Sequence, residues 1–174
     1  MVTFVPYAFL VLLVVVERIA ELVVSERHAR WMIGHGGVEH GREHYPPMVA
    51  LHTALLAGCL LEPLVLQRPF VPALGLPMLA AVVLAQALRW WAIRSLGVRW
   101  STRVIVMPHA SRVARGPYRV LSHPNYVAVV VEGIALPLVH SAWITAIAFT
   151  VMNAVLLAVR ISVEDHALDA AEAS

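Results

Sequence analysis

The sequence contains no lysine, a single cysteine and few charges of either sign. All 13 basic residues are arginines, 14% of the 174 residues are charged, and 60% are hydrophobic. Because soluble domains are about 45–50% apolar and about 25% charged, this composition, with a mean hydropathy of +0.75, indicates a membrane protein. The one cysteine, Cys59, lies in an apolar run; this excludes a disulfide framework and a CxxC metal or redox motif.

The sequence also lacks the basic face of a nucleic-acid-binding protein and the features of a cleaved signal peptide. The arginines flank apolar runs instead of forming the basic face of a soluble domain, so no nucleic-acid partner is expected. Met1–Tyr7 carries no positive charge, and no small-residue cleavage site follows the first apolar run. We therefore expect an uncleaved membrane anchor rather than a signal peptide.

Long apolar segments fill most of the chain. They cover residues 4–24, 46–66, 72–95, 124–139 and 142–163. A span needs about 20 apolar residues, which the first three provide, while Pro137 and His140–Ser141 predict a tight reversal that makes the last two a helical hairpin. We expect one all-α domain over 1–174 with about five transmembrane helices, three of them over 4–95 and the functional region over 96–168.

Arginine placement predicts the orientation. The 25–45 connection holds three arginines and the 96–123 connection holds five, whereas the 67–71 loop holds only Arg68 and the turn near residue 140 holds none. Because positive charge is retained inside, both long connections are expected in the cytoplasm. With five spans, the N-terminus then lies outside and the C-terminus inside.

The most distinctive stretch is the polar, basic turn Gly116–Tyr126 between apolar runs. Pro124 suits the first position of a helix, where its missing N–H would be unpaired in any case. Free backbone N–H groups at 124–126 and the helix dipole would favour an anion, and Arg115 and Arg119 add positive charge. The turn therefore predicts a membrane-surface site for a ligand with a phosphate or carboxylate.

Several ionisable residues lie inside predicted spans. Arg18 and Glu21, next to Glu17, are three residues apart and share a helix face. Arg89 lies in the third span and Glu132 in the fourth. Such groups are costly in a bilayer and usually face the bundle interior or a wet cavity. An interfacial ion pair is the alternative for the first three, and Glu132 is a candidate for the chemistry.

A second charged group ends the fifth segment. Arg160 and Glu164 are four residues apart, so both can face one pocket, and Asp165 follows. A carboxylate there could bind ribose hydroxyls or stabilise a cation, and the arginine could hold a carboxylate or polarise an oxyanion. An interfacial cluster that ends a membrane helix is the alternative.

Three ordered motifs resemble the isoprenylcysteine carboxyl methyltransferase superfamily. They are Gly-Pro-Tyr-Arg at 116–119, His-Pro-Asn-Tyr at 123–126 and Arg-Ile-Ser-Val-Glu-Asp at 160–165. The similarity covers about residues 97–168. Ser122 stands where many members have a basic residue, and Asp165 replaces a second glutamate and shortens its reach.

The front half resembles a bacterial subgroup. The matching motifs are Glu17–Leu22, Gly36–Gly41, His44–Pro46 and Leu51–His52. Members of this subgroup are often associated with type III polyketide synthases and methylate alkylpyrones or alkylresorcinols. The resemblance implies a site at the inner face of a bacterial cytoplasmic membrane and a lipophilic acceptor that enters from the bilayer.

The same resemblance implies S-adenosylmethionine as methyl donor and S-adenosylhomocysteine as product. The expected cofactor-binding residues are Trp100, Tyr118, Arg119, His123, Pro124, Asn125, Tyr126, Glu164 and Asp165. Aromatic faces attract a sulfonium, and Glu164 can bind the ribose diol or the amine. Trp100 has an interfacial anchor as its alternative role. No Gly-x-Gly-x-x-Gly motif follows a strand pattern, which argues against the fold of a soluble methyltransferase.

Methyl transfer requires alignment and exclusion of water more than it requires acid–base chemistry. An ionised alkylpyrone enol would need an arginine or histidine to orient it, whereas a resorcinol would need a general base. The catalytic candidates are Arg160, Glu132 and His44, and His52 is a further possible base.

The histidines at 35, 40 and 44 do not predict a metal site. His40 and His44 have helical zinc-ligand spacing, but the glycines around them disfavour a helix and no H-E-x-x-H pattern is present. A surface turn or a cytoplasmic lid over the cofactor is expected instead.

Two other classes of function remain open. Membrane reductases of the sterol reductase type share a His-Pro-x-Tyr turn and a C-terminal hairpin, and they use NADPH. A non-catalytic membrane partner protein would bind neither cofactor and would give Arg160 and Glu164 no dedicated role.

Overall fold

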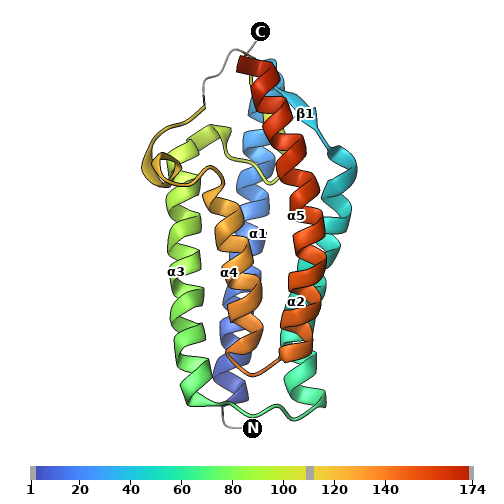
Figure 1. Ribbon diagram of the computed structural model, residues 1–174, viewed down its shortest axis with the longest axis vertical. Helices are drawn as coiled ribbons and strands as arrows, with labels where there is room; N and C mark the ends of the chain where they lie inside the picture. Colours follow the sequence, from blue (N-terminus) through green and yellow to red (C-terminus); the bar gives the residue numbers. More distant parts are fainter. Residues whose placement is uncertain (1–2, 109–111, 173–174) are drawn as a thin grey trace.

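Five α-helices form an elongated bundle (Figure 1). The structure is a computed structural model that describes residues 3–108 and 112–172. The helices are α1 (Phe4–Gly34), α2 (Tyr45–Val65), α3 (Pro72–Leu96), α4 (Pro124–Leu138) and α5 (Trp143–Glu172). The predicted all-α class is confirmed.

The helices run alternately up and down, so the two termini lie at opposite ends of the bundle (Figure 1). Strands β1 (Val38–His40) and β2 (Val104–Val106) pair antiparallel near the C-terminus, with Val38 opposite Val106. We call this the sheet end and the opposite end, which holds the α4–α5 turn, the turn end. Three short 3-10 helices complete the sheet end: η1 (Arg42–His44), η2 (Gly97–Arg99) and η3 (Gly116–Arg119).

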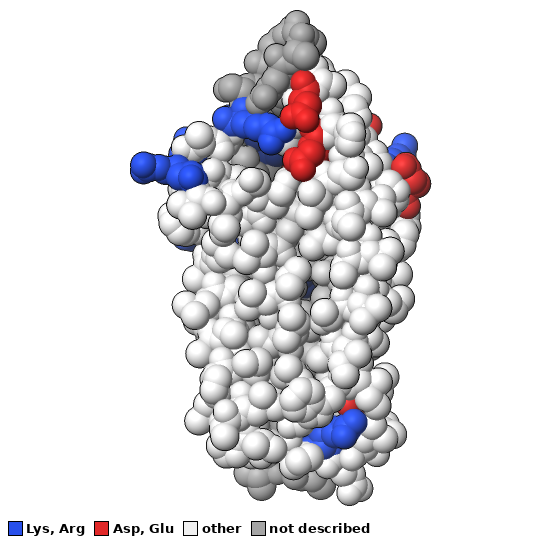
Figure 2. Space-filling view, in the orientation of Figure 1, with Lys and Arg blue, Asp and Glu red and all other residues white. Residues whose placement is uncertain are grey.

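Three stretches of helix are long and apolar enough to cross a membrane, namely Arg42–Val65, Pro72–Arg99 and Trp143–Ala171. Figure 2 shows that the flank of the bundle in view carries almost no charge, while charged side chains gather toward the ends. The predicted first span is not among these three, because Glu17, Arg18 and Glu21 interrupt the apolar part of α1. The 15 residues of α4 rise only about 22 Å, less than the hydrocarbon core of about 30 Å.

Two helices extend beyond their predicted apolar segments. Helix α1 continues to Gly34 and α5 to Glu172, because the polar turns that follow each apolar run contain no proline or internal glycine. The 25–45 connection therefore shrinks to residues 35–44. Near the end of α5, Asp169 is helical and pairs with Arg112 at 2.5 Å.

Helix α4 packs between α3 and α5, α5 also packs on α2, and α1 packs on α2. The predicted α4–α5 hairpin is confirmed: the Ala142 N–H donates to the Pro137 carbonyl at 2.9 Å and Ser141 has a φ of +57°. Close approach of the two helices needs Gly133, where a Cβ would lie 2.0 Å from the Phe149 ring. The hairpin therefore fixes the position of α4 relative to α5.

A group of five charged side chains, the ionic cluster, joins α1, α3 and α4; three of them are buried and two, Glu17 and Arg18, are half-buried. Its members are Glu17, Arg18, Glu21, Arg89 and Glu132. Arg18 lies 2.7 Å from Glu21 and 3.4 Å from Glu132. Arg89 donates to Glu132 and lies 3.7 Å from Glu21. These ion pairs connect side chains of three different helices, so the cluster holds α1, α3 and α4 together.

The ionic cluster predicts that Arg89→Ala strongly destabilises the folded protein. The substitution leaves Glu21 and Glu132 in an apolar interior with one cation fewer, so we expect the free energy of unfolding to fall by roughly 3–5 kcal/mol. Denaturation of the detergent-solubilised protein measures it. Arg30→Ala is the control, because the Arg30 side chain is 73% exposed and its loss should change stability by less than about 1 kcal/mol. Equal effects of the two substitutions would contradict a structural role for the cluster.

His140 lies in the α4–α5 turn and is buried among aromatic rings at the turn end. Its ring centroid lies 5.2 Å from that of Tyr7, 6.0 Å from Phe4 and 6.1 Å from Phe70. This burial lowers the pKa of His140, because the charged form loses its hydration. The folded protein therefore holds His140 in its neutral form at neutral pH.

This shift predicts a loss of stability in acid. The unfolded chain, with an ordinary histidine pKa of about 6.5, binds the proton more tightly than the folded protein does. The stabilisation is complete above about pH 6.5 and is lost as the pH falls through that value. Thermal melting between pH 8 and 5 should therefore show a shallower acid decline for His140→Gln than for the unmodified protein. Identical pH profiles would contradict the assignment.

Candidate active site

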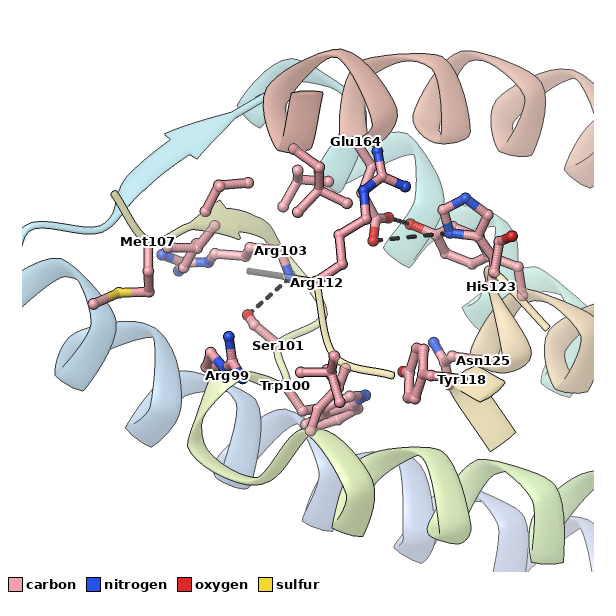
Figure 3. Close-up of a pocket in the computed structure, with 18 of the residues that line it drawn as sticks. Arg99, Trp100, Ser101, Arg103, Met107, Arg112, Tyr118, His123, Asn125 and Glu164 are labelled. Carbon is pink, nitrogen blue, oxygen red and sulfur yellow. Dashed lines mark hydrogen bonds and ion pairs between the residues drawn. The ribbon is translucent and has the colours of Figure 1, made fainter. Parts of the chain in front are cut away.

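A cavity of about 310 Å³ opens at the sheet end of the bundle. Its walls come from β2, the connection after it, η3, the start of α4 and the C-terminal part of α5. Figure 3 shows side chains from these separate elements converging on one space. The cavity therefore unites segments that are far apart in the sequence.

Gly116 allows η3 to lie against the end of α3. Its φ is +58°, and a Cβ at this position would lie 2.1 Å from the Ser95 hydroxyl oxygen; only glycine fits both conditions. Arg115 Nε donates to the Ser95 carbonyl at 2.7 Å and fixes the turn. The turn places Tyr118 in the cavity wall. Burial raises the pKa of the Tyr118 phenol, with Glu164 adding to the effect, so the hydroxyl stays neutral at physiological pH.

Helix α4 begins as predicted, with His123 at the N-cap and Pro124 at the first helical position. The His123 side chain makes no capping hydrogen bond. Its ring instead stacks on Tyr126 at 5.3 Å, and its Nε2 lies 3.2 Å from an Asp165 oxygen. His123 therefore links α4 to α5.

The predicted anion site on the backbone N–H groups of residues 124–126 is wrong for two of the three positions. Pro124 has no N–H, and the Tyr126 N–H donates to the His123 carbonyl at 3.1 Å. Arg119, expected to add charge, is exposed and does not line the cavity. Positive charge in the wall comes instead from the side chains of Arg99, Arg103, Arg112 and Arg160.

A hydrogen-bonded group joins α4, α5 and the residues before β2. Arg160 Nε donates to the Tyr126 hydroxyl at 2.8 Å, and that hydroxyl donates to Glu164. A second Arg160 nitrogen donates to the Thr102 carbonyl. Because Arg160 is 6% exposed, these contacts fix its guanidinium and hold Glu164 in the cavity wall.

Besides His123 Nε2, which lies 3.2 Å from Asp165 Oδ1, two buried polar atoms in the wall have no hydrogen-bond partner within residues 3–108 and 112–172: Trp100 Nε1 and Asn125 Oδ1. Trp100 is 3% exposed, which contradicts its alternative role as an interfacial anchor. An unpaired buried polar atom costs about 1–3 kcal/mol. The two atoms therefore mark places where a ligand can donate and accept hydrogen bonds.

Most of the residues predicted to bind the cofactor or to act in catalysis lie together around this cavity. Those that line it are Trp100, Tyr118, His123, Asn125, Tyr126, Arg160 and Glu164. Pro124 is buried beside it, and Asp165 pairs with His123 and lies 3.9 Å from Arg112.

The other catalytic candidates lie elsewhere. Glu132 belongs to the ionic cluster, His44 lies in η1 with its Nε2 3.7 Å from Glu43, and His52 packs edge-on against Phe149. None of the three lines the cavity. The three possible general bases, Glu132, His44 and His52, therefore lie outside the cavity that the predicted cofactor residues line.

Sequence reasoning missed the wall formed by Ser101–Met107. This wall depends on pairing between β1 and β2, whose residues are more than sixty positions apart. The only local signal was the excess of arginine in the 96–123 connection. Residues 38–40, expected in a surface turn or lid, form the outer strand of this wall.

The histidine series gives no metal centre in the part of the chain that the structure describes. No group of three His, Cys, Asp or Glu side chains there is placed to hold a metal ion. His40 lies in β1 and His44 in η1.

The bundle, with its three long apolar helices and a polar cavity at one end, is that of an integral membrane protein. Residues 78–170 match the Isoprenylcysteine carboxyl methyltransferase (ICMT) family, and the chain belongs to this family. Its expected activity is therefore of the membrane methyltransferase type.

Two bacterial relatives extend the similarity over most of the chain. The uncharacterized protein YpbQ of Bacillus subtilis (strain 168) is 36% identical over 160 residues, which cover 91% of this chain and 94% of the relative. An uncharacterized protein of Haemophilus influenzae is 25% identical over 154 residues, 87% of this chain and 88% of the relative. No solved structure matches the chain.

Tyr126→Phe tests the hydrogen-bonded group. Loss of the hydroxyl removes one partner each from Arg160 and Glu164, so we expect the free energy of unfolding to fall by about 1–3 kcal/mol. Tyr118→Phe is the control, because the Tyr118 hydroxyl makes no hydrogen bond with the described residues. Chemical denaturation in detergent compares the two. A Tyr126→Phe protein as stable as the control would show that the bond does not hold the site together.

Proposed function

We propose that the protein transfers a methyl group from S-adenosylmethionine to an oxygen of a lipophilic acceptor at the cytoplasmic face of a bacterial membrane. Membership of the ICMT family supports methyl transfer. The cavity supports the choice of donor, through the groups that line it.

The observation that carries the proposal is the combination of groups in one cavity. Glu164 offers a fixed carboxylate to a ribose diol or an amine. Tyr118 and Tyr126 offer aromatic faces to a sulfonium. The unpaired Trp100 N–H and Asn125 oxygen can pair with the edge of an adenine. A volume of about 310 Å³ lies within the usual range for small-molecule sites, roughly 300–1,000 Å³.

When bound, S-adenosylmethionine supplies an electrophilic methyl group. The protein must then orient an acceptor oxygen and exclude water. Arg160 suits the first task, because it is a buried cation whose hydrogen bonds go to neutral groups, the Tyr126 hydroxyl and the Thr102 carbonyl. Within the described residues, no carboxylate lies within ion-pair distance of Arg160. An acceptor oxygen with negative charge would supply the missing counter-charge.

The separation of Glu132 and His44 from the cavity favours an acceptor that arrives ionised. An alkylpyrone enol or a prenylcysteine-type carboxylate needs orientation more than deprotonation, whereas an alkylresorcinol needs a base. The short α4 begins well below the upper ends of α1 and α5 (Figure 1). This arrangement supports a site near the boundary of the hydrocarbon, where the alkyl tail of an acceptor can enter from the bilayer.

Arginine distribution supports a cytoplasmic site. Nine arginines outside the buried groups lie at the sheet end: 27, 30, 42, 94, 99, 103, 112, 115 and 119. At the turn end, Arg68 alone carries positive charge among the described side chains. By the positive-inside rule, the sheet end and C-terminus face the cytoplasm and the N-terminus lies outside.

Titration calorimetry of the detergent-solubilised protein tests the donor. S-adenosylhomocysteine should bind and NADPH should not, although the arginines in the wall could attract a nucleotide phosphate. Glu164→Ala should weaken S-adenosylhomocysteine binding by roughly 10- to 100-fold, the effect of losing a hydrogen bond to a charged group.

Glu43→Ala is the matched control, because this side chain is 73% exposed and lies outside the cavity. Binding of NADPH in place of S-adenosylhomocysteine would assign a reductase instead. Binding of neither would favour a non-catalytic membrane partner.

A further inference from the structure

Acidic and basic residues are segregated along this chain. Between Glu62 and Glu132 the sequence contains no Asp or Glu but eight arginines. This stretch builds α3, η2 and η3. The carboxylates of the sheet end come from α1, β1, η1 and α5 instead. Figure 2 shows the result: the basic side chains above the α3 side have no acidic neighbour in view, whereas red and blue atoms mix toward α5. One side of the sheet end is therefore cationic.

Five exposed residues of this cationic side define what we call the α3–η3 rim: Trp91, Arg94, Arg115, Arg119 and Val120. The three arginines are exposed. Among the residues that the structure describes, no carboxylate lies within ion-pair distance of any of them. Arg94 contacts the Trp90 ring at 6.0 Å, and Arg115 donates to the Ser95 carbonyl.

The rim also has an apolar part. Trp91 is 55% exposed and Val120 is 87% exposed. Nineteen residues separate Pro72 from Trp91 on α3, a rise of about 28 Å at about 1.5 Å per residue. This rise matches a hydrocarbon core of about 30 Å, so a bilayer with one boundary at Pro72 would have its other headgroup layer at Trp91, where tryptophans are enriched.

We propose that the α3–η3 rim binds the headgroup of an anionic phospholipid. Arg94, Arg115 and Arg119 would contact the phosphate and the charged headgroup. Trp91 and Val120 would contact the glycerol and the first methylenes of the acyl chains. No rim residue lines the cavity, so this site is separate from the proposed donor site. Trp91 and Val120 favour a lipid over a free phosphate, because a free phosphate has no apolar part for these side chains to contact.

The rim is connected to the cavity through η3. Arg119 follows Tyr118 in the same 3-10 turn, and Tyr118 lines the cavity. A lipid held by Arg115 and Arg119 therefore fixes the turn that carries Tyr118. This coupling, unlike lipid binding itself, rests on the proposed function: an anionic membrane should tighten binding of S-adenosylhomocysteine.

Native mass spectrometry of the detergent-solubilised protein, titrated with phosphatidylglycerol or phosphatidylcholine, tests lipid binding. The unmodified protein should retain phosphatidylglycerol at least tenfold more tightly. Arg94→Gln and Arg119→Gln should each weaken this binding about fivefold. Arg30→Gln is the matched control, because this exposed arginine already pairs with Glu26 at 3.6 Å, and it should retain the lipid. Inorganic phosphate at millimolar concentration should not displace the lipid.

Three results would overturn the proposal: equal retention of the two lipids, an Arg30→Gln effect as large as that of Arg119→Gln, or displacement of the lipid by phosphate. Melting temperatures of the same samples report that each variant is folded.

A second experiment measures S-adenosylhomocysteine binding in nanodiscs of phosphatidylcholine with and without phosphatidylglycerol. Tighter binding with phosphatidylglycerol, lost in Arg119→Gln, supports the coupling, and no difference refutes it. Selective lipid retention without S-adenosylhomocysteine binding anywhere would leave the lipid site standing and remove the proposed function.

Discussion

Charge buried in a bilayer must be compensated within the protein, and this constraint organises the bundle. The ionic cluster satisfies it between α1, α3 and α4, with Arg18 close to three carboxylates and Arg89 close to two. The charge of Arg160 is compensated differently. Its guanidinium donates to the Tyr126 hydroxyl and the Thr102 carbonyl, and no carboxylate of the described residues lies within ion-pair distance of it. Structural and candidate functional charge are thus distinguished by their partners: the arginines of the cluster are ion-paired directly, whereas Arg160 lies next to the cavity and is linked to Glu164 through the Tyr126 hydroxyl.

The ionic cluster and the α4–α5 hairpin position the same helix. Glu132 attaches α4 to α3, and Gly133, the next residue, gives the close contact with Phe149 of α5. Because α4 is held on both sides, its start presents His123 and Tyr126 to α5 and Asn125 to the cavity. A membrane scaffold with few polar contacts therefore builds a polar cavity at one end, where the chain leaves the hydrocarbon.

Local motifs predicted much of the site, because His-Pro-Asn-Tyr and Arg-Ile-Ser-Val-Glu-Asp lie on consecutive helices joined by a tight turn. The same reasoning failed where the outcome depended on distant parts of the chain. The Ser101–Met107 wall requires pairing with β1, and Glu132 could be assigned to the ionic cluster only once α1 and α3 were placed beside it. The backbone anion site failed for a local reason: proline has no N–H, and the first turn of α4 uses its own donors.

The most direct test of the account is an experimental structure of the detergent-solubilised protein with S-adenosylhomocysteine. The account predicts density for the nucleoside in the cavity, with its ribose near Glu164 and its adenine near Trp100 and Asn125. Ligand density elsewhere on the bundle, or a cavity closed by its own side chains at saturating ligand, would contradict it.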